Sequence, residues 1–74
     1  MIDLAIHGAA GRMGRRLVAL ACEASDLRVA AALDHAEHPQ LGEDAGRLAG
    51  LEPIGVPLSV EPTGKVDVVV DFSL

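Results

Sequence analysis

The spacing of hydrophobic residues along this chain changes several times, and each change predicts a new element. Residues Ile2 to Ile6 are apolar apart from Asp3 and rich in strand formers, which predicts a β-strand. After Gly11 the apolar residues recur every three or four positions, as on one face of a helix. The residues expected on that face are Met13, Leu17, Leu20, Ala21 and Ala24. We expect this helix to end near residues 24–26, where small polar residues continue it poorly.

A second strand is predicted from Arg28 to Leu33, although alanine is a weak strand former. A strand, a helix and a strand within about 30 residues form a parallel crossover unit. Residues 35–53 show no clear period and include Gly42, Gly46 and Gly50. Because glycine costs a helix about 1 kcal/mol, we interpret this segment as a loop with a short helical turn. A closely packed, glycine-lined helix is the alternative.

The last third of the chain predicts two further strands. Residues 55–60 form a possible third strand, and Pro57 within it indicates either an edge position in the sheet or a later start of the strand. Residues 61–65 are typical of a turn. The run from Val66 to Phe72 is the strongest strand, and its near-continuous apolar character predicts a central strand buried on both faces. The fold class is therefore α/β, with a partial Rossmann-type parallel sheet that forms the amino-terminal portion of a dinucleotide-binding domain.

Composition limits the class of protein further. The chain has 74 residues, half of them hydrophobic, with one Phe and no Trp or Tyr, so its core consists of small aliphatic side chains. A net charge of −5 argues against nucleic acid as a partner. A single cysteine, Cys22, excludes an internal disulfide and is interpreted as a packed mid-helix residue. No apolar run approaches the roughly 20 residues of a membrane span, and we expect a cytoplasmic protein without membrane contact.

The main chemical motif is Gly8-Ala9-Ala10-Gly11-Arg12-Met13-Gly14, which follows the first strand and opens the helix. Its glycines have the spacing G-x-x-G-x-x-G. Small residues let the backbone approach a pyrophosphate, and the last glycine lets the helix pack closely on the strand. Free amides and the positive helix end attract the phosphates. The cofactor-binding residues expected here are Gly8, Ala9, Ala10, Gly11, Arg12 and Met13.

Asp34 makes this motif more specific, because it ends the second strand 20 residues after Gly14. An acid at about this distance is expected to bind the ribose hydroxyls of a dinucleotide. The alternative is an ordinary glycine turn in which Asp34 caps a loop. Arg12 is interpreted as a partner of the pyrophosphate or of the 2′-phosphate of NADPH, since a cation in a first helical turn is otherwise unfavourable.

Three other side chains are less clearly assigned. Met13 is expected in the core by default, although its early position also lets it touch adenine or ribose. His35 follows the acid and is a candidate neighbour of the ribose 2′ position. The spacing of His7, His35 and His38 is not that of metal ligands, so no metal site is predicted.

The glycine motif closely resembles the nucleotide loop of the dihydrodipicolinate reductase family. Residues 31–34 resemble that family's second strand and acidic ribose ligand, residues 41–50 its following loop, and residues 67–73 its fourth strand. The resemblance implies NADH or NADPH as cofactor and a small cyclic dicarboxylate as substrate, reduced with loss of water in lysine and diaminopimelate biosynthesis. It also places Phe72 and Ser73 near the cofactor, and it implies a homo-oligomer for the full-length protein.

Two departures from the family are visible. Residues 61–65 leave almost no room for the usual helix between the third and fourth strands, which predicts poorer cover of the fourth strand. His35 stands where many members have a basic residue, so the preference between NADH and NADPH is left open. The family's catalytic residues lie beyond Leu74, so residues 1–74 are expected to be a partial dinucleotide-binding domain that is inactive alone. A non-catalytic binding module and another G-x-x-G-x-x-G oxidoreductase are the alternatives, although His7 replaces the threonine usual in short-chain dehydrogenases.

Overall fold

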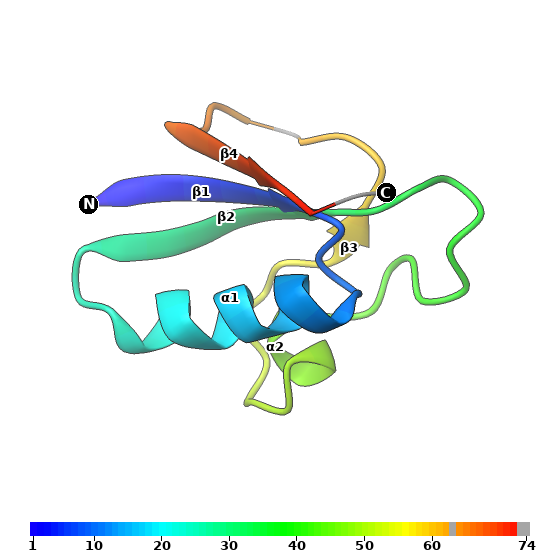
Figure 1. Ribbon diagram of the computed structural model, residues 1–74, viewed down its shortest axis with the longest axis horizontal. Helices are drawn as coiled ribbons and strands as arrows, with labels where there is room; N and C mark the ends of the chain where they lie inside the picture. Colours follow the sequence, from blue (N-terminus) through cyan, green and yellow to red (C-terminus); the bar gives the residue numbers. More distant parts are fainter. Residues whose placement is uncertain (63, 73–74) are drawn as a thin grey trace.

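The computed structural model describes residues 1–62 and 64–72. Its elements are β1 (Ile2–His7), α1 (Arg12–Glu23), β2 (Leu27–Leu33), α2 (Ala45–Leu48), β3 (Leu58–Ser59) and β4 (Val68–Asp71). The four strands form one parallel sheet in the order β3-β2-β1-β4. Figure 1 shows α1 and α2 on the same side of this sheet. The architecture confirms the predicted partial Rossmann-type α/β fold.

Strand β1 lies in the middle of the sheet although it comes first in the sequence. Leu4 pairs with Val29 of β2 on one side and with Val68 of β4 on the other. Its Ala5 and Ile6 are fully buried, Ile6 in the main core with residues of α1 and Ala5 in a smaller cluster with Ala31, Leu33 and Val66. At the amino end of the sheet, the guanidinium of Arg28 makes two contacts of 2.8 and 2.9 Å with the Asp3 carboxylate.

Helix α1 covers β1 and β2 with a face that matches the prediction only in part, since Ala21 is buried and Leu17 packs against the core as expected. Its buried residues are Gly14, Val18 and Ala21. Met13 and Leu20 are 53% and 56% exposed, so their predicted place on the core face is wrong. The reason is that Gly14 packs directly on the turn before the helix, which rotates positions 14, 18 and 21 toward the sheet.

The segment between β2 and β3 confirms the predicted loop with a short helical turn. Helix α2 has four residues, so the alternative of a longer glycine-lined helix is wrong. Strand β3 has two residues and lies at the sheet edge, as Pro57 predicts.

One carboxylate, that of Asp44, holds this loop together. Its Oδ2 accepts hydrogen bonds from the N–H groups of Gly46, Arg47 and Ile54 at 2.9, 3.2 and 2.9 Å. Its Oδ1 accepts from Gly55 and Val56 at 2.7 and 3.1 Å. The hydrogen bond from Ile54 is the main cause of a lowered pKa of Asp44, and partial desolvation opposes it. A single side chain therefore caps α2 and fixes the chain that leads into β3.

Strand β4 does not have the predicted burial on both faces. Val68 and Val69 are 44% and 59% exposed. Within the described residues β4 pairs with β1 alone, and α1 covers β1 and β2 instead (Figure 1). The absence of a helix between β3 and β4 in the described part of that connection agrees with the poorer cover expected from its length.

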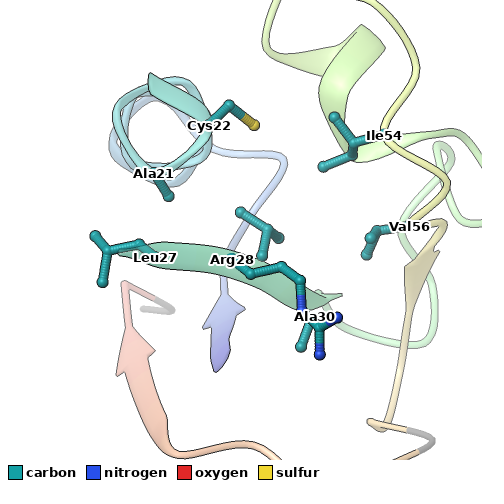
Figure 2. A pocket seen from close by; sticks show the side chains of 8 residues that line it. Ala21, Cys22, Leu27, Arg28, Ala30, Ile54 and Val56 are labelled. Atoms are coloured by element: carbon teal, nitrogen blue, oxygen red, sulfur yellow. The ribbon is translucent and has the colours of Figure 1, made fainter. Parts of the chain in front are cut away.

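The short α2 leaves part of β2 uncovered. A groove of about 510 Å³ lies there, between α1 and residues 54–56 (Figure 2). Cys22 borders it and is exposed, so its predicted packed position is wrong. Partial desolvation of its sulfur by the groove, with a smaller effect of the Asp44 charge, raises the pKa of the Cys22 thiol. This groove lies along the first half of β2, whereas ligands of such sheets bind at the carboxyl ends of the strands.

Candidate functional site

The turn between β1 and α1 is attached to the end of the neighbouring strand. Gly8 has a φ of 83°, a left-handed conformation that favours glycine. The N–H groups of Gly8 and Ala9 donate to the Leu33 carbonyl at 2.8 and 3.0 Å. The Gly11 N–H donates back to the Gly8 carbonyl at 3.0 Å. The turn is thus closed on itself and fixed to β2.

The last glycine of the motif is required by close packing. A Cβ atom at position 14 would lie 2.2 Å from the Gly8 oxygen and 2.7 Å from the Ala9 Cα. At Gly11 a Cβ atom would meet the Gly8 oxygen at 3.3 Å. The first turn of α1 therefore rests on the backbone of the glycine turn, as predicted from the motif.

The start of α1 presents free hydrogen-bond donors. Gly11 is the N-cap residue and offers no side-chain cap, and the first turn has no acidic residue. In the described part of the chain, no carbonyl or side chain accepts from the N–H groups of Arg12, Met13 and Gly14. Unpaired donors at a helix N-terminus form an anion-binding site. Arg12 is exposed beside them and adds positive charge.

Ala9 and Ala10 have a different role from the one their motif position suggests. Both are buried, and the N–H of Ala10 donates to the Asp34 carboxylate at 3.3 Å. The Ala9 N–H is bonded to the Leu33 carbonyl, so the N–H groups of both residues are already paired within the turn.

Asp34 connects three elements at the carboxyl edge of the sheet. Its side chain is buried, with Oδ2 facing Ala10 and Oδ1 accepting the His35 N–H at 2.9 Å. Its own N–H donates to the Ser59 carbonyl of β3 at 2.9 Å. The carboxylate therefore fixes the glycine turn, a contact that the sequence pattern did not reveal. It also borders an open hollow, which leaves room for a ligand.

Two hollows meet at the turn, and together they form the candidate site. One of about 560 Å³ is lined by His7, Gly8, Gly11, Asp34, His35, His38 and Phe72. The other, of about 500 Å³, is lined by Gly8, Gly11, Arg12, Met13, Gly14, Asp71 and Phe72. They share the glycine turn and Phe72 at the end of β4. Ser73, which the resemblance also places here, lies outside the described residues.

Five of the seven residues expected to bind the cofactor line these hollows, whereas Ala9 and Ala10 are buried in the turn. His38 also lines the first hollow, which its position in the sequence did not indicate. Met13 reaches the site from its exposed position on α1. Arg12 lines the second hollow, beside the free amides of α1, and not the hollow around Asp34.

Residues 1–62 and 64–72 lack two kinds of feature, a metal-binding cluster and a membrane-spanning helix. No cluster of His, Cys, Asp and Glu there is arranged to hold a metal ion. None of the helices in this part of the chain has the length and apolar character needed to cross a membrane.

A parallel sheet, a glycine turn leading into a helix and an acid at the end of β2 define the class of Rossmann-type nucleotide-binding domains. A family model described as "Dihydrodipicolinate reductase, N-terminus" matches residues 2–74. The chain therefore belongs to the dihydrodipicolinate reductase family, of which it carries the amino-terminal part.

Curated relatives agree with this assignment. The chain is 46% identical over 76 residues to the 4-hydroxy-tetrahydrodipicolinate reductase of Syntrophotalea carbinolica, covering 99% of this chain and 28% of the relative. It is 42% identical over 78 residues to that of Rhodopirellula baltica, with the same coverage of each chain. The reductase of Methanocaldococcus jannaschii is 41% identical over 81 residues, covering all of this chain and 30% of the relative. The chain spans less than a third of the length of these relatives.

Proposed function

We propose that this chain binds NADH or NADPH as the nucleotide-binding part of a 4-hydroxy-tetrahydrodipicolinate reductase. The observation that carries the proposal is the set of unpaired amides at Arg12, Met13 and Gly14, placed beside the closed Gly8 turn. A pyrophosphate needs several donors and no steric crowding, and this turn offers both. The names of the relatives support the reductase assignment.

Each part of the site is assigned a role. Gly8 to Gly11 form a turn of small residues that the pyrophosphate can approach, and the free amides of Arg12, Met13 and Gly14 donate to it. Gly14 also allows the close packing, and Arg12 supplies charge. The Asp34 carboxylate accepts hydrogen bonds from the hydroxyls of the adenosine ribose. Phe72, at the end of β4, borders both hollows and so limits the path of the cofactor between them. When bound, the cofactor supplies the hydride.

The catalysed reaction and the oligomeric state are properties of the full-length protein. We assign to it the reduction of 4-hydroxy-tetrahydrodipicolinate to tetrahydrodipicolinate, a step of lysine and diaminopimelate biosynthesis, and a homo-oligomeric state. The described residues contain the cofactor-binding elements, and no substrate-binding or proton-transfer role is assigned to any of them. Residues 1–74 alone are therefore expected to show no reductase turnover.

The first test is cofactor binding by the intact protein. Titration with NADH and with NADPH is expected to change the fluorescence of the reduced nicotinamide with saturation, because the free amides and Arg12 attract the pyrophosphate. Flat titration curves up to millimolar cofactor for both compounds would contradict the proposal. Adenosine, which lacks the phosphates, is expected to displace bound NADH only weakly and serves as the control in competition.

The second test concerns Asp34. The Asp34→Ala protein is expected to bind NADH about 1–3 kcal/mol more weakly, the cost of losing charge-assisted hydrogen bonds to the ribose. Asp34→Asn retains one oxygen that can accept the Ala10 N–H, so it separates the loss of charge from loosening of the turn. Asp26→Ala, at an exposed position between α1 and β2, is the matched control. NADH affinity that is unchanged in a folded Asp34→Ala protein would refute the ribose contact.

A further inference from the structure

The carboxylate of Asp71 has no role in the function proposed above, although it borders the place assigned to the pyrophosphate. Asp71 is the last residue of β4, and its side chain is 57% exposed. It lines the second hollow together with the residues whose amides are free, Arg12, Met13 and Gly14. The pyrophosphate of a dinucleotide is doubly negative, so a carboxylate on the wall of its site repels it. The strength of binding therefore depends on the charges that lie beside Asp71.

The imidazole of His7 lies against this carboxylate. Its Nδ1 is 3.6 Å from Oδ1 of Asp71, a distance at which a protonated imidazole and a carboxylate form an ion pair. The two residues are register partners at the carboxyl ends of β1 and β4. The Phe72 N–H also donates to the His7 carbonyl at 2.8 Å, so the backbone joins the two strand ends whatever the charge of the ring. The sheet therefore holds the two side chains close together.

The charge of this pair of side chains changes with pH. Imidazole changes its charge between about pH 5 and pH 8. The His7 ring is partly exposed and lines a hollow, so protons reach it from solvent. Protonated His7 offsets the negative charge of Asp71 beside the pyrophosphate, whereas neutral His7 supplies no charge there. The attraction of the second hollow for a pyrophosphate is therefore expected to decrease as the pH rises.

We propose that His7 and Asp71 form a charge pair that sets the affinity of the site for a pyrophosphate and lowers it as the pH rises. His7 acts on the pyrophosphate through Asp71, at the boundary between the two hollows. The effect is the same for NADH and NADPH, because both contain the same pyrophosphate. This inference rests on the cofactor site proposed above.

Other charged and titratable groups lie around the pair of His7 and Asp71. On the side of Asp71, the second hollow contains Arg12 of α1. On the side of His7, the first hollow contains one carboxylate and two further imidazoles, those of Asp34, His35 and His38. These three groups border the place assigned to the adenosine ribose, so their titration affects adenosine and NADH alike. Adenosine, which has no phosphate, therefore separates their effect from that of the charge pair.

The test measures the dissociation constant of NADH between about pH 6 and pH 8.5 for the intact protein and its His7→Gln variant, with adenosine in competition as the uncharged control. For the unmodified protein the constant is expected to rise about threefold to tenfold with pH, the effect of one charge near a partly exposed, salt-screened site. His7→Gln is expected to lose this part of the pH dependence and to bind NADH more weakly at the acidic end only. Both proteins share every other titrating group, so the difference between them reports His7.

The Asp71→Asn variant is expected to change binding in the opposite direction. Without the carboxylate, NADH should bind several-fold more tightly at the alkaline end, because the repulsion of the pyrophosphate is removed. A further His7→Gln change in this variant should then have little effect at any pH, since the two side chains act as a pair. Loss of a structural contact alone would weaken NADH binding instead, so the sign of the change distinguishes the two roles.

Each outcome has a separate meaning. A His7→Gln protein that keeps the original pH dependence, or that binds NADH more weakly by the same factor at every pH, overturns the proposal. A folded Asp71→Asn protein with weaker NADH binding at the alkaline end also overturns it, and if this variant does not fold, the His7→Gln comparison decides alone. Failure of the unmodified protein to bind NADH at any pH would instead contradict the proposed function itself.

Discussion

Replacing Gly14 with alanine is expected to destabilise the fold by at least about 2 kcal/mol and to remove cofactor binding. The new methyl group would lie 2.2 Å from the Gly8 oxygen, and both close neighbours are backbone atoms that no side-chain rotation can move. The turn and the first turn of α1 must therefore separate, which displaces the free amides of Arg12 and Met13. Without this clash, alanine would stabilise the helix by about 1 kcal/mol relative to glycine. A loss of stability in Gly14→Ala would therefore show that the clash with the turn outweighs helix propensity.

Urea unfolding and NADH titration of the intact Gly14→Ala protein measure these two effects. Gly64→Ala is the matched control, since a Cβ atom at Gly64 meets nothing within 4 Å. Gly11→Ala is expected to lose an intermediate amount of stability, because a Cβ atom at position 11 would lie 3.3 Å from the Gly8 oxygen. A Gly14→Ala protein as stable as the unmodified one would show that the helix does not rest on the turn as described.

The Asp44→Asn protein is expected to show a clear decrease in its thermal unfolding midpoint, larger than that of Asp26→Asn at an exposed site. The asparagine amide presents a donor where one carboxylate oxygen now accepts, so several of the five N–H groups lose their partner. The consequence should be local first, with faster amide exchange at Ile54, Gly55 and Val56. Exchange at these amides that matches the unmodified protein would contradict the role of Asp44.

The stabilisation of the fold by Asp44 depends on pH in a direction that can be predicted. The pKa of Asp44 is lowered in the folded state from a model-compound value of 3.8, mainly through the Ile54 hydrogen bond. Its stabilising contribution is therefore complete above the unfolded pKa and is lost as the pH falls through the folded pKa. The difference in midpoint between Asp44→Asn and the unmodified protein should stay constant from pH 8 to 6 and shrink below pH 4. A difference that grows in acid would contradict this reasoning.

Several parts of this structure can be predicted from the sequence because they depend on local patterns. The change from strand to helix period at Gly11 locates β1 and α1 to within one or two residues. The glycine spacing and the distance to Asp34 predict that the turn and the acid lie close together. They do so because each follows one of two neighbouring parallel strands. The family resemblance, which the family comparison confirms, rests on the same segments.

Other features depend on contacts that a local pattern does not contain. The helical period is equally compatible with Met13 or Val18 facing the core, and the contact between Gly14 and the turn decides between them. The apolar run of β4 indicates a buried strand, but the burial of a strand depends on which elements pack against it, and Val68 and Val69 remain exposed. Asp44 precedes a helical turn as an N-cap does, but its bonds to residues 54–56 join segments that are ten or more positions apart.

The central place of β1 has a consequence for the order in which the chain can assemble during synthesis. β1 leaves the ribosome first, and β2 can pair with it as soon as the crossover unit is complete. Its other edge must wait for β4, since Leu4 meets Val68 only 64 positions later. During that interval this edge of β1 has no partner within the chain and is open to pairing with another chain. Docking of β4 therefore protects β1 and moves the edge of the sheet from the first strand of the chain to the last one described.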